Sequence, residues 1–198
     1  MIEIIFNSVV AYFSTNLDYL LVLVLLLGSY KNPKLVLTGD LIGTVGLTLL
    51  PMAIARILGA VPEMWILGLL GIFPILFGIK ELIPLKPHSR DEIDGDSNIS
   101  KLRIVTKVIA ITITACGADN VAVFIPIFIK KTNLELFSAL ITMIVMAVIF
   151  FFVAILIEDN KPIKNILGKY GRYFSSVVYI MLGISVLVQN GTIAHFFH

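Results

Sequence analysis

Apolar residues in this chain come in long runs, separated by short polar or turn-forming segments. A transmembrane helix needs about 20 apolar residues at a rise of about 1.5 Å each. By that measure the sequence contains six predicted spans, at residues 4–28, 35–58, 65–83, 104–129, 136–157 and 174–190. The pattern therefore predicts an all-α integral membrane protein with six transmembrane helices.

The connections between these spans are rich in turn-forming and polar residues. Lys31-Asn32-Pro33, residues 59–63 and residues 130–133 are short connections, and residues 158–173 are expected to separate the last two spans. The one long polar connection lies at residues 84–103. We expect one transporter domain over residues 1–198, made of a three-helix unit at 1–84, a cytoplasmic linker at 85–103 and a second three-helix unit at 104–198.

Composition narrows the class further. The chain is 58% hydrophobic and only 14% charged, and its mean hydropathy of +0.99 lies outside the range of soluble domains. The sequence contains no phosphate-binding loop, HExxH or CxxC motif, so we expect no enzyme activity and no bound cofactor. The single cysteine, Cys116, excludes an internal disulfide.

The basic residues are distributed unevenly between the two predicted sides of the membrane. Twelve fall in the first, third and fifth connections or at the adjoining span ends, and three fall on the opposite side. The twelve are Lys31, Lys34, Lys80, Lys86, Arg90, Lys101, Arg103, Lys107, Lys161, Lys164, Lys169 and Arg172, and the three are Arg56, Lys130 and Lys131. The positive-inside rule predicts that the twelve face the cytoplasm and that both termini lie outside.

Two acidic residues lie deep inside predicted spans. Asp18 and Asp119 each occupy the middle of an apolar run, with no lysine or arginine at similar depth. A carboxylate at the centre of a membrane helix costs roughly 2.5–3.5 kcal/mol on insertion scales. A bound proton or metal cation is the simplest compensation, so the pair predicts a protein that handles cations.

The same two aspartates relate the two halves of the chain. They lie 101 positions apart, each in the first span of a three-helix unit, and Leu70-Gly71-Ile72 in the third span corresponds to Leu182-Gly183-Ile184 in the sixth. A repeat with an odd number of spans must be inverted in the membrane. Inverted repeats commonly place substrate and ion sites near the midplane, where the repeats meet.

Helical spacing groups further polar residues with these aspartates. Ser14, Thr15 and Asp18 are expected on one face of the first span, and Thr112, Cys116, Asp119 and Asn120 on one face of the fourth. Asn16 lies about 200° from Asp18 in a regular helix, so both reach one site only if the helix breaks between them. Expected sources of irregular backbone are Pro51, Pro74, Gly117 and Pro126.

These residues form a chemically sensible set for a divalent cation. Carboxylate, amide and hydroxyl oxygens suit hard ions, whereas the Cys116 sulfur shifts the preference towards softer ions such as Cd²⁺ or Zn²⁺. Repulsion and desolvation of neighbouring aspartates favour their protonation when metal leaves, which provides a physical basis for metal–proton exchange.

Asp40 begins a third polar stripe, which continues through Thr44 and Thr48. It lies only a turn or so inside the second predicted span. Two interpretations remain open, a ligand or gate near the cytoplasmic side, or a solvated carboxylate favoured by the helix dipole. Because Asp40 is expected to keep contact with water, its replacement by asparagine is expected to matter less than replacement of Asp18 or Asp119.

Four short motifs resemble those of bacterial cadmium-resistance transporters, a family of the lysine-exporter superfamily. They are Thr15-Asn16-Leu17-Asp18, Gly39-Asp40-Leu41-Ile42-Gly43, residues 70–79 and Gly117-Ala118-Asp119-Asn120. The resemblance covers almost the whole chain and implies Cd²⁺ efflux across the bacterial cytoplasmic membrane. It assigns Asn16, Asp18, Asp119 and Asn120 to the metal.

The chain departs from the family pattern at three positions. Tyr19 stands where members often have an acidic or amide residue, Asp40 where an amide is common, and Cys116 where a small or polar residue is expected. The expected metal-site residues are therefore Asp18, Asp119, Asn16, Asn120, Cys116, Thr15 and Asp40.

Two other functions stay open from the sequence. One is a lysine-exporter-like carrier of small amino acids or organic cations, and the other is a membrane partner subunit without transport activity. The expected partners are a divalent metal ion, as transported substrate, and the lipid bilayer. No nucleic-acid partner is expected, and a homodimer is one compatible assembly.

Overall fold

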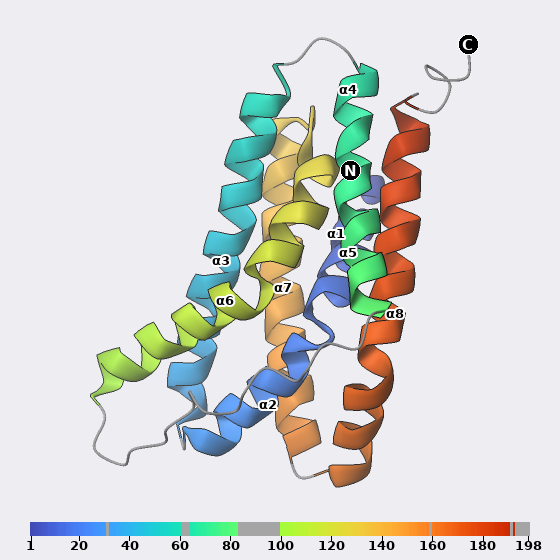
Figure 1. Cartoon of the computed structure of the whole chain (residues 1–198). Helices are drawn as coiled ribbons and strands as arrows, with labels where there is room; N and C mark the ends of the chain where they lie inside the picture. The colour runs from blue at the N-terminus through green and yellow to red at the C-terminus, as the bar shows by residue number, and fades with distance from the viewer. Residues whose placement is uncertain (31, 61–63, 83–99, 159, 191, 193–198) are drawn as a thin grey trace.

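The computed structural model describes residues 1–30, 32–60, 64–82, 100–158, 160–190 and 192. All regular structure in these residues is helical, which confirms the predicted all-α class (Figure 1). The elements are α1 (Ile2–Asn16), α2 (Tyr19–Ser29), α3 (Pro33–Leu58), α4 (Met64–Gly68), the 3₁₀ turn η1 (Leu69–Gly71), α5 (Ile72–Leu82), α6 (Lys101–Phe128), α7 (Asn133–Glu158) and α8 (Lys161–Gln189). Most of the predicted linker at 85–103 lies outside the described residues.

Several of the described helices have the length and composition of membrane spans. These are α3, α6 and α7, and the bent pair α1–α2 makes a fourth when counted as one span. Two shorter apolar helices, Trp65–Lys80 and Tyr173–Val188, accompany them. The protein is therefore a multi-pass membrane protein.

The first predicted span is broken. Its two halves, α1 and α2, are bent by 63° at Leu17 and Asp18. None of the residues expected to disturb the helices lies at this break. Instead, Ser14, Thr15 and Asn16 each hydrogen-bond through their side chains to the carbonyl four residues earlier. Such back-bonding competes with the helix ladder and bends helices, which explains why this one stops here.

The last helix begins earlier than the hydropathy pattern predicts. Residues 158–173 were expected as a connection, but α8 is helical from Lys161 onwards, so that prediction is wrong. Pro162 lies in the first turn, where its missing N–H removes no helical hydrogen bond. The hydropathy pattern detects only the part of a helix that is apolar enough to lie in a bilayer. The helix itself can extend beyond that part, as α8 does here.

Two glycines bring α3 and α6 into close contact. A Cβ atom on Gly39 would lie 2.7 Å from Val108 Cβ, and one on Gly43 would lie 2.9 Å from Thr112 Cβ. Because these contacts advance together along both chains, the two helices run parallel (Figure 1). This is the small-xxx-small arrangement that permits close helix packing in membranes.

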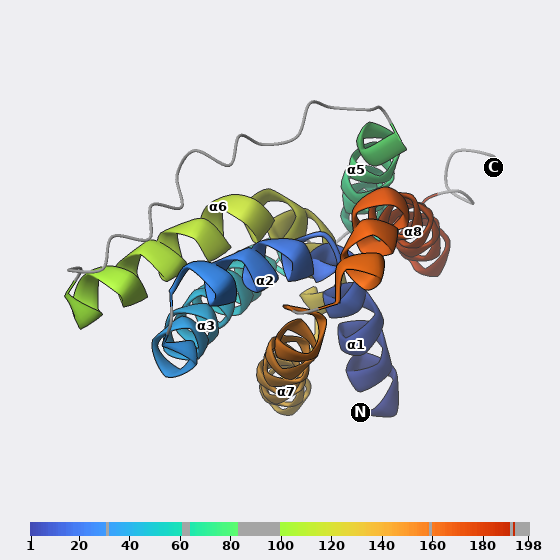
Figure 2. The same ribbon diagram turned by 90° about the horizontal axis from the view of Figure 1, so that it is seen from below.

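A second glycine contact joins α5 to α8, which lie together on one side of the molecule in the end-on view (Figure 2). A Cβ atom on either Gly71 or Gly183 would overlap the carbonyl oxygen of the other. Further along, Gly78 lies against the backbone of Ser176. The contacts advance in opposite directions along the two chains, so this pair is antiparallel.

The helix α7 packs along the broken first span. Met1 contacts Ser138, and Tyr12 packs edge-on against Phe150 with ring centroids 5.3 Å apart, so α1 and α7 run parallel. At the end of the bundle where α7 begins, Lys131 lies 3.6 Å from Glu3. Thr192 donates a hydrogen bond to the Trp65 carbonyl. The first residues of the chain and residue 192 therefore lie at the same end of the helix bundle, the end at which α4 and α7 begin.

Candidate metal site

Two buried polar faces meet where α3 packs on α6. We call them the polar seam, defined as Asp40, Thr44 and Thr48 of α3 with Thr112, Cys116 and Asn120 of α6. All six side chains are buried, and within each helix they recur every fourth position. The predicted stripe of α3 is therefore confirmed as one interior face, and so are three of the four residues predicted for α6.

The broken first span adds two tyrosines to this seam. The Tyr19 hydroxyl, at the start of α2, donates a hydrogen bond to Asp40 Oδ1 at 2.8 Å and lies 2.8 Å from Thr112 Oγ1. The Tyr12 hydroxyl faces Thr44. The break between α1 and α2 lies between the two tyrosines, so both reach the seam because of the bend and not through regular helical spacing. The sequence analysis did not predict their role.

Asp40 is the most deeply buried carboxylate among the described residues, with 1% of its surface exposed. One oxygen accepts the Tyr19 bond, and the other has no hydrogen-bond partner in the described part of the chain. The interpretation of Asp40 as a solvated residue is therefore wrong. Gly39 and Gly43, on either side of it, let α6 approach closely enough to exclude water.

Asp18 and Asp119 have the opposite environment to the expected one. Asp18 is exposed on the helix bundle and Asp119 is half-buried. Asp18 does not share a face with Ser14 and Thr15, which are buried, because the helix breaks before it. Asp18 and Asp119, which lie deepest in the predicted spans, are thus less enclosed in the structure than Asp40.

The three aspartates all lie within electrostatic range of one sulfur. Cys116 is buried, and Asp18, Asp40 and Asp119 act on it from the break between α1 and α2, from α3 and from its own helix α6. A common site for Asp18 and Asp119 stays a prediction.

The predicted amide and hydroxyl ligands are placed differently from one another. Asn120 is buried, and its Oδ1 has no hydrogen-bond partner among the described residues. Asn16 Nδ2 donates to the Tyr12 carbonyl and to Thr15 Oγ1, and Thr15 Oγ1 donates to the Ala11 carbonyl. Thr15 and Asn16 therefore hold the end of α1, whereas Asn120 presents an uncommitted oxygen.

The charge balance of this interior is negative. None of the lysines and arginines whose burial the structure describes is buried, so none of these side chains offsets Asp40 from within. No group of three or more His, Cys, Asp or Glu residues gathers closely enough there to form a complete metal centre. Any cation would have to complete its coordination with hydroxyl, amide or water oxygens.

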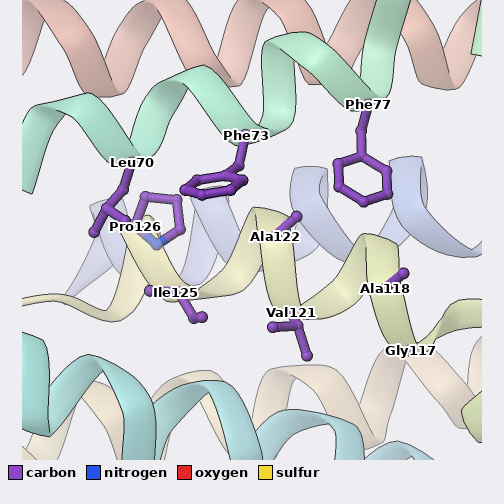
Figure 3. A pocket seen from close by; sticks show the side chains of 9 residues that line it. All are labelled: Leu70, Phe73, Phe77, Gly117, Ala118, Val121, Ala122, Ile125 and Pro126. Atoms are coloured by element: carbon purple, nitrogen blue, oxygen red, sulfur yellow. The ribbon is translucent and has the colours of Figure 1, made fainter. Parts of the chain in front are cut away.

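A separate cavity of about 420 Å³ lies between α5 and α6. Leu70, Phe73 and Phe77 line it from one side, and α6 contributes the other wall between Gly117 and Pro126 (Figure 3). By helical geometry this wall is the face of α6 opposite Cys116. The lining is almost entirely carbon, so the cavity is unsuited to a metal ion.

Helices of membrane-spanning length around a buried carboxylate define a multi-pass membrane protein with a polar interior. Residues 12–198 match the family model described as cadmium resistance transporter, and the chain belongs to that family. Its members are transporters and not enzymes. No curated protein and no solved structure matches the chain.

Proposed function

We propose that this protein exports Cd²⁺ from the cytoplasm through the polar seam, in exchange for protons, and so confers resistance to the metal. The observation that carries the proposal is Asp40, a buried carboxylate with one oxygen that has no hydrogen-bond partner among the described residues, while none of the lysines and arginines of described burial is buried. A buried charge without a protein counter-charge is costly unless a cation offsets it. Membership of the cadmium resistance transporter family supports cadmium as that cation.

The three aspartates support a route from the surface to the interior. Asp18 is exposed, Asp119 is half-buried and Asp40 is enclosed, and all three lie around Cys116. In this proposal Asp18 and Asp119 capture the ion, and Asp40, Cys116 and Asn120 bind it in turn at successive levels along the seam. When the ion leaves, the desolvated carboxylates favour protonation, which couples metal movement to protons.

The arrangement of helices supports six spans in two inverted units. Under that symmetry α1–α2 corresponds to α6, α3 to α7 and α5 to α8. Both α6 with α3 and α1 with α7 form parallel pairs, while α5 and α8 meet antiparallel at Gly71 and Gly183. We propose that the two units rock against each other to give alternating access, as in other inverted-repeat transporters.

We place the end of the bundle where α3 and α6 begin in the cytoplasm, following the positive-inside rule. Lys101→Cys at that end and Ala60→Cys at the other end replace exposed residues. In a Cys116→Ser background, an impermeant thiol reagent should label Ala60→Cys in intact cells and Lys101→Cys only after permeabilisation. The reverse pattern would invert the topology.

Flux through proteoliposomes tests the proposed function directly. Purified protein in sealed vesicles should move Cd²⁺ and should acidify or alkalinise the lumen in step with the metal. Vesicles that transport amino acids and ignore Cd²⁺ would favour the lysine-exporter-like carrier. Vesicles that transport neither would favour a partner subunit. Cellular Cd²⁺ content with and without the protein determines the direction.

Cys116 should set part of the metal preference. Cys116→Ser keeps the size of this buried side chain but replaces a soft sulfur ligand with a hard oxygen. We expect Cd²⁺ flux to fall by about tenfold relative to Mn²⁺ flux, which corresponds to about 1.4 kcal/mol. Competition between the two metals in proteoliposomes measures this ratio. An equal loss for both metals would show that the sulfur only packs.

A further inference from the structure

The proposed ligands leave Tyr19 without a role, although its position is unusual. Tyr19 is 2% exposed, follows Asp18 directly and is the first residue of α2. Its hydroxyl contacts two other helices, at Asp40 Oδ1 of α3 and Thr112 Oγ1 of α6, each at 2.8 Å. One phenol thus connects the broken span to both walls of the polar seam.

The number of protons determines the direction of these hydrogen bonds. A phenol has a single hydroxyl proton. When Asp40 is ionised, Tyr19 uses that proton in the hydrogen bond to Asp40 Oδ1, because a carboxylate only accepts. Thr112 must then be the donor in its contact with Tyr19, or it donates to the Val108 carbonyl at 2.9 Å. In either arrangement Asp40 Oδ1 already accepts one hydrogen bond, whereas Oδ2 has no partner in the described part of the chain and is the oxygen more open to an ion.

We propose that Tyr19 is a specificity-determining residue, which restricts Asp40 to binding an ion through one oxygen and so disfavours hard cations. This inference rests on the proposed function. Ca²⁺ takes six to eight oxygens, often with bidentate carboxylates, and Mg²⁺ demands near-ideal octahedral oxygen coordination. A single Asp40 oxygen, in a seam that also carries the Cys116 sulfur, favours softer ions of low coordination number.

The geometry explains why Tyr19 suits this task. A hydrogen bond to an ionised group is among the stronger ones in proteins, and burial protects it from competition by water. The ring is fixed by its own burial, and the second contact to Thr112 limits rotation of the hydroxyl. A soft cation that needs only one carboxylate oxygen leaves this arrangement intact, whereas a hard cation must break it.

Tyr19→Phe tests the inference, because it removes the hydroxyl and keeps the ring. In proteoliposomes that contain the full chain, competition between Cd²⁺ and Mn²⁺ should show the preference for Cd²⁺ falling by roughly tenfold, the size expected for one hydrogen bond to a charged group. Most of the change should come from a gain in Mn²⁺ flux. Tyr19→Leu should shift the ratio in the same direction and serves as the second variant.

Tyr30→Phe is the matched control. It removes a phenolic oxygen from another buried tyrosine, at the opposite end of α2 from Tyr19. The Cd²⁺ to Mn²⁺ ratio should remain at the wild-type value in this variant. A change of the same size would mean that any buried hydroxyl on this helix affects the ratio, and it would overturn the inference.

The remaining outcomes separate the two proposals. Wild-type vesicles that carry no Cd²⁺ would overturn the proposed function and, with it, the role of Tyr19. Wild-type vesicles that carry Cd²⁺, together with an unchanged ratio in Tyr19→Phe and Tyr19→Leu, would overturn the role of Tyr19 alone. An equal loss of both metals would do the same, because it indicates a residue that only supports the fold.

Discussion

Replacing Asp40 with asparagine should abolish Cd²⁺ transport and should also stabilise the metal-free protein. Asparagine keeps the size of the side chain and an oxygen that accepts the Tyr19 bond, but it removes the charge. We expect a loss of at least about 100-fold, beyond the 10–100-fold typical of losing a group that only orients a metal ligand. Flux in proteoliposomes measures this change.

The expected gain in stability follows from the same burial. Asp40 is enclosed, and none of the lysines and arginines whose burial the structure describes is buried with it. Removing an uncompensated charge relieves its desolvation cost, and the melting temperature should rise by about 2–4 °C for each kcal/mol regained. Thermal unfolding in detergent with a metal chelator measures it. A variant that loses both transport and stability would indicate a structural role for Asp40.

Asp18→Asn and Asp119→Asn provide the comparison. Each should abolish or strongly reduce transport if these residues capture the ion. Neither should raise the melting temperature as much as Asp40→Asn, because Asp18 is exposed and Asp119 is only half-buried. The sequence analysis expected Asp40→Asn to be the mildest of the three variants because it assumed that Asp40 is solvated. Asp40 is buried, so that reason no longer holds. Near-normal transport by Asp40→Asn would nevertheless support the original ranking.

Gly183→Ala should destabilise the protein severely. A Cβ atom at this position would overlap the Gly71 carbonyl oxygen and lie 2.5 Å from Ile75 Cγ1. Since the first of these is backbone, the helices α5 and α8 must separate to relieve the overlap. Overpacking costs about 1–3 kcal/mol when side chains can adjust, and we expect a value at or above the upper limit here. Melting temperature and membrane yield report the loss.

Gly46→Ala is the matched control for this prediction. Gly46 lies in the interior of α3, and nothing lies within 4 Å of the position its Cβ would occupy. There alanine should gain up to about 1 kcal/mol through its higher helix propensity. Gly71→Ala should behave like Gly183→Ala. If Gly183→Ala were as well tolerated as Gly46→Ala, the close approach of α5 and α8 would be refuted.

Local patterns in the sequence predicted the features that depend on one helix at a time. The stripe from Asp40 to Thr48 repeats every four residues, and so does the one from Thr112 to Asn120. Each repeat maps onto one face whatever the helix packs against, and both faces are buried in the structure. The break in the first span was also recognised as a requirement, although its cause was not.

The break in the first span comes from serine, threonine and asparagine, which the sequence analysis did not treat as sources of irregular backbone. Proline and glycine are the usual disturbers of membrane helices, but the bend follows three consecutive side chains that return to the backbone, at positions 14–16. Only the structure shows that all three side chains hydrogen-bond to the carbonyl four residues earlier. The sequence alone is also compatible with other hydrogen-bond partners.

The sequence by itself determined that this is a helical membrane protein with acidic residues inside its apolar runs, because both properties follow from composition and spacing. Only the tertiary structure decided which aspartate is enclosed. The position of a residue along a helix does not show which other helices pack against it. Asp40 is buried because Gly39 and Gly43 allow the distant segment α6 to pack closely. The bend in the first span then places Tyr19 against Asp40 and Thr112. Burial is a property of several segments at once, and no single segment encodes it.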